Sequence, residues 1–449
     1  MAEHLLSVGL DVGTTSTQLI VSRLTAENQA SSFAVPEMQI TEREILYKSP
    51  VYLTPLLDPS HIDGEGIRKI VREEYERAGI TRESVDTGAV IITGETSRKE
   101  NAEAVLAALS QYAGDFVVAT AGPDLESRLA ARGAGAAAYS EDTGKTVLHM
   151  DIGGGTSNLC LIREGKILDT GCLNVGGRLL TYDENRRLIW VSQALKPLFS
   201  GKPGDLFTEA QGDDLAERLT RVLEMAAGLR PAGEELGQLI TKEGKLLDLT
   251  ALTERPVLSF SGGVADCMET PMPSDSFGDL GPQLGRAILK SRLCRGPYRL
   301  GAETIRATVI GAGCHSAQLS GSTVFYQNIR FPLKNLPAVR ADSMEELRKA
   351  LLRQEKTPVI AMPGLRAPGY AEIASLADRL AQLPQPLILC LQQDMAKALG
   401  QALALRLGRG AEILCMDSIC LQEDSYLDVG SPVGPAIPVV VKTLILEKG

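Results

Sequence analysis

The sequence predicts an α/β protein that consists of two similar α/β halves around one cleft, followed by an additional C-terminal α/β unit. The first observation is a motif that occurs twice: a strand ends in Asp-x-Gly, small hydroxyl residues follow, and a second strand begins. Its copies lie at Val8–Val21 and Leu148–Ile162, and their aspartates, Asp11 and Asp151, are 140 positions apart. The second observation is that strands and helices alternate along the rest of the chain, which is typical of α/β folds.

Each copy of the motif is expected to form a β-hairpin whose tip binds phosphate. Glycine has no Cβ, so backbone N–H groups at the tip can approach an anion closely. A carboxylate at the strand end can then hold a hydrated Mg²⁺ against the phosphate, which assigns Asp11 and Asp151 to the metal. Asp-x-Gly-Gly-Gly alone could equally be a tight turn, and the second copy favours two halves that face one nucleotide. The predicted phosphate-binding residues are Gly13, Thr14, Thr15, Gly153, Gly154, Gly155 and Thr156.

The composition argues against several classes of function. A length of 449 residues, 44% of them hydrophobic and 23% charged, allows about three domains with large cores. The net charge of −10 and the pI near 5.2 argue against a nucleic-acid partner and against anionic membranes. No basic leader and no apolar run of roughly 20 residues is present, so a cytoplasmic protein without membrane insertion is expected. Scattered cysteines and histidines favour reduced thiols over disulfides or a zinc site.

The rest of the first half alternates between helices and strands. Asp63–Ala78 is predicted to be an amphipathic helix, because Ile67, Ile70 and Val71 recur on one side and the other side is charged. Thr87–Thr93 is a short run of strand-forming residues, typical of a buried strand. The other predicted elements here are strands within Met38–Leu53, a helix over Arg98–Tyr112 and a strand over Phe116–Ala121.

Two segments rich in alanine and glycine, Asp124–Tyr139 and Glu303–Leu319, are predicted to be helices that connect the halves. Small residues let another backbone approach closely, and two crossing helices beneath the cleft would allow the halves to rotate. The glycines expected at the crossing are Gly133 and Gly135, facing Gly311 and Gly313.

Glu126, near the start of the first connecting helix, is a candidate catalytic residue together with Asp11 and Asp151. An acid beside the phosphate site can orient an attacking water. The alternative is an acid that only complements the positive N-terminal end of the helix. The sequence does not decide between these two interpretations.

The second half contains a motif suited to a nucleoside. Pro256–Cys267 is a strand that breaks at Gly262 and Gly263 into a helix, which offers flat backbone to a nucleoside and a helix N-terminus to phosphate. The more polar stretch Tyr182–Lys245 is expected to be a smaller inserted subdomain. Further predictions in this half are a strand over Lys166–Cys172 and a helix start at Gly176-Gly177.

Beyond residue 320 no catalytic constellation is recognisable, and 321–449 is predicted to be an interaction or structural unit. The chain is thus expected to divide into halves at 1–140 and 141–320 and this third unit, although Val324–Phe331 could add a strand to a core sheet. The elements predicted in it are helices over Ser343–Arg353, Ala371–Gln382 and Met395–Arg409, and strands at Pro337–Val339, Pro358–Ala361, Pro386–Leu391, Ala411–Met416 and within Val433–Leu446.

The order of these motifs resembles that of the superfamily of actin, heat-shock chaperones and sugar kinases, whose members share an actin-like ATPase fold. The order is phosphate loop, connecting helix, phosphate loop, adenosine loop and connecting helix, at Val8–Val21, Asp124–Tyr139, Leu148–Ile162, Leu258–Cys267 and Glu303–Leu319. More narrowly, the whole chain is similar to the reactivating factors of ethanolamine ammonia-lyase. That similarity rests on Thr93–Ala102, Gly122–Ser140 and the C-terminal unit.

This resemblance implies an ATP-dependent, chaperone-like protein with ATPase activity. It would release damaged or inactive cobalamin from ethanolamine ammonia-lyase so that intact adenosylcobalamin can enter. On the matching positions, Asp11 and Asp151 would position Mg²⁺, the two loops would hold the phosphates of ATP, and Glu126 would orient the water. Gly262 and Gly263 would back the adenosine. The implied location is the cytoplasm, with association with a bacterial microcompartment as a further expectation.

The cobalamin-ligand motif Asp-x-His-x-x-Gly is absent from the sequence, so the protein is expected to act on the shape of the lyase rather than to carry the cofactor. The alternatives are a small-molecule kinase of the same fold, a nucleotide-dependent scaffold or filament protein, and an electron-donating activator of dehydratases with an iron–sulfur cluster. A related cobalamin-dependent dehydratase is also open as the partner. The sequence does not decide whether the chain forms homo-oligomers.

Overall fold

The first half is built on a mixed sheet with the strand order β3-β2-β1-β7-β8, and a short strand, β4, also pairs with β2. β1, β2 and β3 form an antiparallel meander, whereas β7 and β8 run parallel to β1. The strands are β1 Glu3–Val12, β2 Ser16–Asn28, β3 Met38–Lys48, β4 Tyr52–Leu53, β7 Thr87–Ile92 and β8 Val118–Thr120. In this computed structural model the described residues are 3–28, 38–58, 60–93, 96, 99–113, 118–120, 123–242, 244–250, 252, 254–315, 318–320, 323–340, 344–352, 357–419, 421, 425–432 and 436–443.

The second half repeats this topology with the order β11-β10-β9-β14-β15. Here too a three-stranded antiparallel meander is followed by two strands parallel to its first strand. The repeated order confirms the predicted fold class, an actin-like fold of two similar α/β halves. The strands are β9 Val147–Ile152, β10 Ser157–Arg163, β11 Lys166–Leu173, β14 Val257–Ser261 and β15 Tyr298–Leu300.

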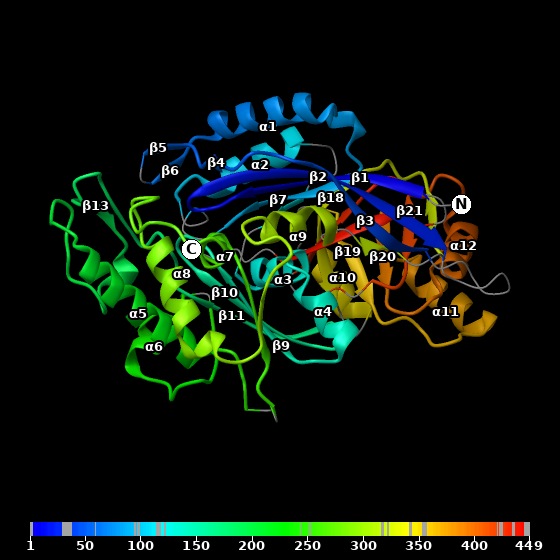
Figure 1. Ribbon diagram of the computed structural model, residues 1–449. Helices are drawn as coiled ribbons and strands as arrows, with labels where there is room; N and C mark the ends of the chain where they lie inside the picture. The colour runs from blue at the N-terminus through cyan, green and yellow to red at the C-terminus, as the bar shows by residue number, and fades with distance from the viewer. Residues whose placement is uncertain are drawn as a thin grey trace.

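Helices separate the two sheets and cover their outer faces (Figure 1). α1 and α2 cover the outer face of the first sheet, α9 packs on its other face, and α3 packs on the second sheet and against α9. The side chains of β1 alternate accordingly, with Val8, Leu10 and Val12 in the core beneath α1 and α2. The helices are α1 Gly64–Ala78, α2 Ala102–Ala113, α3 Pro123–Gly133, α4 Ala136–Thr143 and α9 Ala307–His315.

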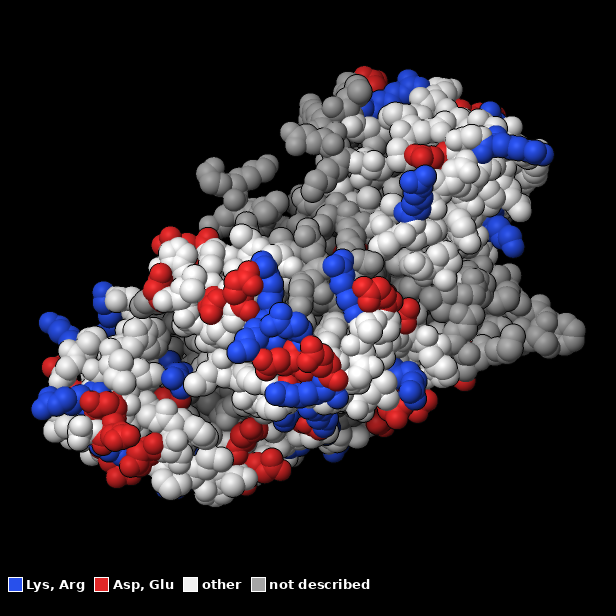
Figure 2. All heavy atoms as spheres, turned by 90° about the horizontal axis from the view of Figure 1, so that it is seen from above, with Lys and Arg blue, Asp and Glu red and all other residues white. Residues whose placement is uncertain are grey.

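The predicted amphipathic helix is confirmed as α1, which begins after the N-cap Asp63 and ends at Gly79 in the left-handed conformation. Its charged side faces solvent, and Figure 2, which looks onto this side of the molecule, shows acidic and basic side chains interleaved rather than gathered by sign. The sequence did not single out Glu74, which is buried and accepts hydrogen bonds from Tyr47 and Tyr52. The predicted ends Arg98, Phe116 and Ala121 lie outside the described residues.

The crossing of the two connecting helices exists, but only part of its predicted glycine set is correct. Gly133 and Gly311 are at the crossing, because a Cβ on Gly133 would overlap the carbonyl oxygen of Ala307, and one on Gly311 would overlap that of Leu129. Gly135 instead has φ 74° and no neighbour within 4 Å of a built Cβ, since it separates α3 from α4.

Gly313 likewise does not face α3. It packs against Gly9 of β1, and its carbonyl oxygen accepts a hydrogen bond of 2.5 Å from Ser7. The stretch predicted as one helix over Asp124–Tyr139 is therefore α3 and α4 with a break between them.

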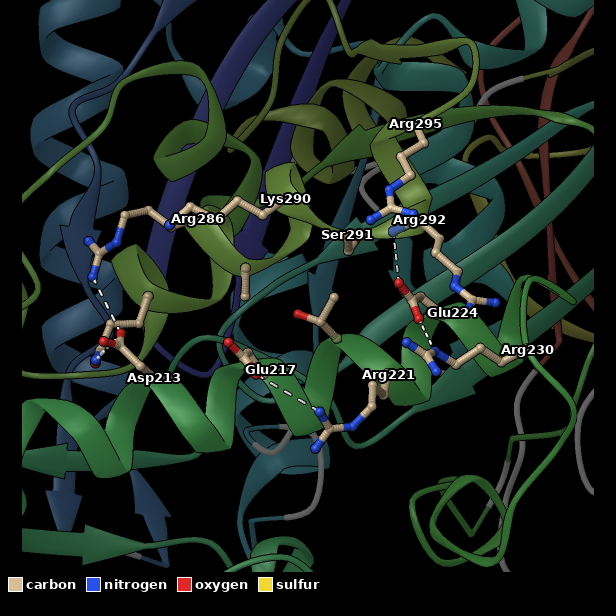
Figure 3. Close-up of a pocket in the computed structure, with 13 residues that line it drawn as sticks. Asp213, Glu217, Arg221, Glu224, Arg230, Arg286, Lys290, Ser291, Arg292 and Arg295 are labelled. Carbon is tan, nitrogen blue, oxygen red and sulfur yellow. Dashed lines mark hydrogen bonds and ion pairs between the residues drawn. The ribbon is translucent and has the colours of Figure 1, made fainter.

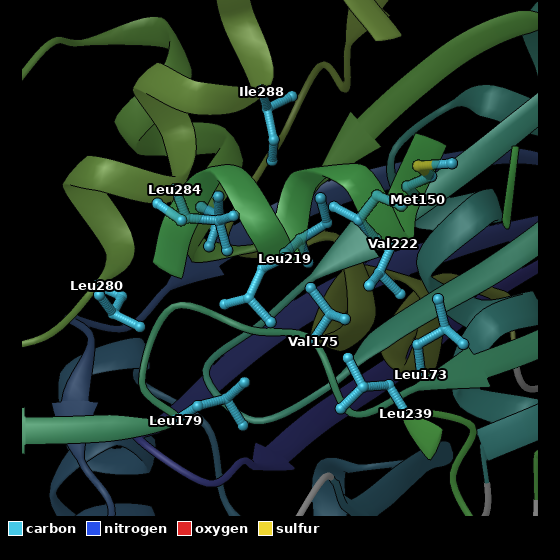
Figure 4. Packing of buried hydrophobic residues seen from close by; sticks show 14 of the residues in the cluster. Met150, Leu173, Val175, Leu179, Leu219, Val222, Leu239, Leu280, Leu284 and Ile288 are labelled. Atoms are coloured by element: carbon cyan, nitrogen blue, oxygen red, sulfur yellow. The ribbon is translucent and has the colours of Figure 1, made fainter. Parts of the chain in front are cut away.

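One hydrophobic core joins the second sheet to the helices of its outer side (Figure 4). Leu219 and Val222 of α5 and Leu284 and Ile288 of α8 pack with sheet residues such as Met150. The helix α8 was not predicted from the sequence. The elements that follow the second meander are β12 Leu180–Tyr182, β13 Leu188–Val191, α5 Glu209–Ala226, α6 Glu234–Gln238, α7 Gly263–Glu269 and α8 Gly281–Lys290.

The C-terminal unit is a separate eight-stranded mixed sheet with the order β16-β23-β22-β18-β19-β20-β21-β17. β18 to β21 are parallel, and α11 and α12 pack beside them. The expectation that Val324–Phe331 adds a strand to a core sheet is wrong, because β17 pairs with β21 of this unit. The elements are β16 Gln318–Leu319, β17 Phe325–Gln327, β18 Leu333–Arg340, α10 Met344–Leu352, β19 Val359–Met362, α11 Tyr370–Leu380, β20 Leu387–Leu391, α12 Ala396–Leu407, β21 Ile413–Met416, β22 Ser425–Val429 and β23 Pro438–Thr443.

No helix in the described ranges is both long and apolar enough to cross a membrane.

Candidate nucleotide site

The two motifs fold into hairpins with the same internal geometry. In the first, Val12 of β1 pairs with Thr17 of β2, and in the second, Ile152 of β9 pairs with Ser157 of β10. Each tip is closed by the same backbone hydrogen bond of 2.9 Å, from Gly13 N to Ser16 O and from Gly153 N to Thr156 O. The local fold therefore presents the two aspartates and the two glycine-containing tips in equivalent ways.

The structure brings all the candidate site residues together in one cleft between the halves. Its cavity volume is about 330 Å³, within the range of small-ligand sites. Their assignment to catalysis, metal and nucleotide stays a prediction. The candidate residues that line the cleft are Asp11, Gly13, Thr14, Thr15, Glu126, Asp151, Gly153, Gly154, Gly155, Thr156, Gly262 and Gly263.

Close approaches around the cleft require glycine at two positions. A Cβ on Gly154 would lie 2.5 Å from the hydroxyl oxygen of Thr15, which belongs to the other loop. Gly262 has φ 87° at the N-cap of α7, and a Cβ there would overlap the carbonyl oxygen of Ile152. The hydroxyl of Thr15 is buried and has no hydrogen-bond partner among the described residues, so this cradle fits an anionic ligand that accepts a hydrogen bond.

Gly176 and Gly177 do not start a helix, because residues 174–179 form the turn between β11 and β12. This turn supports the second loop instead: Gly177 N donates to Gly153 O at 2.9 Å, and Arg178 N donates to Gly154 O at 2.7 Å.

Asp11 and Asp151 are buried carboxylates, and no basic residue of the described ranges forms an ion pair with either of them. They are 8% and 6% exposed. The pKa of Asp11 is raised to about 7, and burial is the main cause. The hydrogen bond from Thr93 opposes this rise, and the charge of Asp151 adds to it. Burial also raises the pKa of Asp151, against hydrogen bonds from Ser261 and Thr308.

The hydrogen-bond partners of these two carboxylates are hydroxyl groups. Thr93 donates to Asp11 at 2.9 Å, Thr308 donates to Asp151 at 3.3 Å, and Ser261 donates to the other oxygen of Asp151. Within the described residues neither aspartate forms an ion pair. Mg²⁺ is commonly held by one or two carboxylates, waters and substrate phosphates, so the donor set fits this ion.

A buried chain of polar side chains stands behind Asp151. His149 of β9 contacts the hydroxyl of Ser259 through Nδ1 at 3.1 Å and that of Ser261 through Nε2 at 3.0 Å. Burial lowers the pKa of His149 to about 3, so the ring is neutral. An ionised Asp151 only accepts, so Ser261 donates to it and accepts from His149 Nε2–H, while Nδ1 accepts from Ser259.

A family model described as Ethanolamine utilisation protein EutA matches residues 3–447. The chain belongs to this family. The ethanolamine ammonia-lyase reactivases EutA of Salmonella typhimurium and Escherichia coli are 38% and 37% identical to it, and each match covers 98% of this chain and 98% of the relative. A solved structure of a Ppx/GppA phosphatase from Aquifex aeolicus covers 69% of this chain and 99% of its own, with 14% identity and a TM-score of 0.38. The family resemblance inferred from the sequence is thereby confirmed.

Several residues of the cleft were missed in the sequence. Gln18 lines the cleft and pairs with Asp11 across its hairpin, and Asn158, which is buried rather than part of the cleft lining, pairs with Asp151 in the same way. Their equal spacing of seven residues after the aspartate was a usable signal. Arg178, by contrast, lines the cleft from a turn and forms an ion pair with Asp279 at 3.6 Å. No local sequence pattern predicts its position.

The arrangement is suited to binding a metal-bound polyphosphate between the two halves. The two buried carboxylates and the loops lie at the hairpin tips, while Gly262 and Gly263 lie at the start of α7. Glu126, half-buried in the first turn of α3, lines the same cavity. α3 and α9, which pack against each other, therefore each contribute a residue to the lining of this cavity, Glu126 and Thr308.

Proposed function

We propose that the protein is an ATP-dependent, chaperone-like reactivating factor that releases damaged or inactive cobalamin from ethanolamine ammonia-lyase, so that intact adenosylcobalamin can bind. The observation that carries the ATP-dependent part is a pair of buried aspartates at the tips of two equivalent hairpins in one cleft, neither of which has a basic partner among the described residues. The choice of partner rests on family membership and on relatives named as reactivases of this lyase.

In this proposal each group of the cleft has one task. Asp11 and Asp151 hold Mg²⁺, which when bound neutralises charge on the phosphates. Thr14, Thr15 and the two loops hold the phosphates, Gly262 and Gly263 lie against the adenosine, and Glu126 orients the attacking water. Closure of the halves on ATP, and their opening afterwards, turns α3 against α9 and changes the shape of the surface that grips the lyase.

The location follows from the partner. We place the protein in the cytoplasm, in association with the bacterial microcompartment that would contain the lyase. No residue of the cleft is assigned to cobalamin, because the proposed mechanism acts on the conformation of the lyase.

The test is a reactivation assay. Ethanolamine ammonia-lyase inactivated with cyanocobalamin is incubated with the protein, ATP, Mg²⁺ and adenosylcobalamin, and ammonia release is followed. Activity is expected to return only when all components are present. A lack of recovery, or equal recovery without ATP, would reject the proposal. A phosphorylated small-molecule product would identify the protein as a kinase instead.

A further inference from the structure

A second cavity lies between α5 and α8, outside the nucleotide cleft. Its volume is about 400 Å³, and none of its lining residues also lines the nucleotide cleft. One wall consists of α5 side chains and the other of α8 side chains together with Ser291, Arg292 and Arg295 beyond the end of α8 (Figure 3). The rigid core beneath both helices fixes this geometry.

The charge of this cavity has the opposite sign to that of the protein. Six basic and three acidic side chains line it, a net of three positive charges in a chain of net charge −10. The acidic residues are Asp213, Glu217 and Glu224. The basic residues are Arg221, Arg230, Arg286, Lys290, Arg292 and Arg295.

Each acidic residue is already paired with a basic residue of the cavity. Asp213 lies 3.8 Å from Arg286, and Glu217 lies 4.0 Å from Arg221 (Figure 3). Glu224 pairs with Arg230, and it also accepts a hydrogen bond of 2.8 Å from the backbone N–H of Arg292. Three of the six basic side chains are therefore already in ion pairs.

The other three cations, Lys290, Arg292 and Arg295, have no carboxylate within 4 Å in the described part of the chain. They are close together in the sequence, and Figure 3 shows Arg292 and Arg295 at one end of the cavity and Lys290 between that end and Arg286. Lys290 also complements the C-terminal end of α8. Arg292 and Arg295 lie beyond that helix, so its dipole does not account for them.

Two features favour the binding of an anion beside Lys290, Arg292 and Arg295. The exposed guanidinium of Arg292 donates a hydrogen bond of 3.2 Å to the carbonyl oxygen of Leu229, which orients it at the cavity. Thr220, in the same lining, is 3% exposed and its hydroxyl has no hydrogen-bond partner among the described residues. Buried hydroxyls are normally satisfied in protein structures, so the cavity wall retains unused hydrogen-bonding capacity.

We infer that this cavity binds a small molecule that carries a phosphate or diphosphate group, with Lys290, Arg292 and Arg295 as its anion-binding residues. Arginine is suited to this ligand because its planar fork matches the geometry of phosphate oxygens. The cavity has the size of a small-molecule site rather than of a protein interface. This inference is independent of the nucleotide cleft and of the proposed function.

The probe for this site is inorganic pyrophosphate, titrated calorimetrically into the full-length protein at low ionic strength, where exposed charges are least screened. The test variant is Arg292→Gln with Arg295→Gln. A second variant, Lys290→Gln, changes an exposed side chain that forms no ion pair with the described residues. The control is Lys196→Gln with Lys202→Gln, which removes two exposed charges of the same half outside the cavity.

We expect saturable binding to the unmodified protein and to the control, and affinity at least about fivefold weaker in the double arginine variant. The Lys290 variant should be weakened in the same direction. Absence of saturable binding, or equal affinity in all variants, would overturn the inference. An equal loss in the lysine control would show only non-specific attraction and would overturn it as well. Binding of a polyglutamate peptide without binding of pyrophosphate would make the cavity a docking site for an acidic protein segment.

Discussion

The two aspartates at the hairpin tips are buried next to each other, and no cation of the described part of the chain pairs with either of them. An uncompensated buried charge is costly, so the site favours either a proton or a metal ion at Asp11, whose pKa burial raises to about 7. The neighbouring hydroxyl groups orient the carboxylates without neutralising them. This is why the carboxylates, rather than the glycines, are expected to give the clearest change in activity.

Replacing Asp11 or Asp151 by Asn removes a charge from a site for a hard cation while nearly preserving its shape. We expect Mg²⁺-dependent ATP hydrolysis, measured as phosphate release, to fall at least about tenfold, which corresponds to roughly 1.4 kcal/mol of barrier. Circular dichroism should show an intact fold. The control is Asp86→Asn, because Asp86 is an exposed acid whose carboxylate accepts a hydrogen bond from Leu6 N and does not line the cleft. Unchanged hydrolysis in both cleft variants would reject the metal assignment.

Ser261 and Ser259 allow a test of the chain behind Asp151. Both serines are fully buried and contact His149, but only Ser261 donates to Asp151. Ser261→Ala and Ser259→Ala should each cost about 1–3 kcal/mol of stability by leaving a buried group unpaired. Only Ser261→Ala should raise the Mg²⁺ concentration needed for half-maximal nucleotide binding. A shift of the same size in Ser259→Ala would show that the effect is merely structural.

A pH effect is expected at Asp417, at the end of β21. Burial raises its pKa from 3.8 to about 7, and the neighbouring charge of Asp394 contributes. Between these values the folded protein retains a proton that the unfolded chain releases, so the free energy of unfolding falls as the pH rises. The loss is on the order of 1 kcal/mol per pH unit between about pH 4 and pH 7. Urea titrations should show a flatter profile for Asp417→Asn, and parallel profiles would contradict the assignment.

The residues of the site were predictable only where the chain marks them locally. Asp11 and Asp151 are marked by a motif that occurs twice with constant spacing. Ser261 and Thr308 reach Asp151 from a neighbouring strand and from α9, so their contact exists only after the sheet and the helix crossing have formed. No periodicity within a single element contains that information.

At the level of elements, the crossing of α3 and α9 was also only partly predictable from local sequence patterns. Composition indicated close-packed helices, but it could not indicate where α3 ends. The position that contacts α9 is Gly133, whereas Gly135 ends the helical run in a left-handed turn. The helix α8 was missed because Gly281 and Pro282 at its start are typical of turns, although proline is favourable in the first turn of a helix.

Gly311→Ala tests the crossing at the contact that the structure identifies. A methyl group there would overlap the carbonyl oxygen of Leu129, so the helices must separate. We expect a loss of about 1–3 kcal/mol of stability, together with weaker coupling between nucleotide binding and lyase reactivation. Gly237→Ala in α6 is the matched control, since a Cβ there has no neighbour within 4 Å. Normal melting temperature and full reactivation in Gly311→Ala would place the coupling elsewhere.

At the scale of the whole molecule, alternating strands and helices were enough to predict an α/β fold, because that alternation is local. Which strands pair within one sheet was not predictable in this way, because it depends on contacts between residues far apart in the sequence. The run around Phe325 was expected to be able to extend a core sheet, yet it pairs with β21 almost ninety positions later in the chain. Likewise β16, which directly follows α9, pairs with β23 near the C-terminus.

The hydrophobic cores of the described residues separate at nearly the same place. The clusters beneath the two halves contain no residue beyond Cys314, and the two clusters of the C-terminal sheet contain none before Val324. A small contact between Ala26 and Ala436 bridges them. A truncation after Ser320 would therefore remove the C-terminal cores as a whole. A truncation after Leu336 would instead cut through β18 and leave part of this sheet attached to the halves.

We propose that the C-terminal unit engages the lyase while the halves turn over ATP, and the truncation after Ser320 tests this division. Because the nucleotide cleft and its cores lie before that point, the shortened protein should fold and retain Mg²⁺-dependent ATP hydrolysis. It should fail to retain the lyase in a pull-down and to restore its activity. In the full chain, Tyr370→Ser with Leu405→Ser changes side chains of α11 and α12 that are 85% and 83% exposed, and it should weaken lyase binding while hydrolysis persists. A folded truncated protein that still reactivates the lyase would refute this proposal, because the halves alone would then both hydrolyse ATP and bind the lyase.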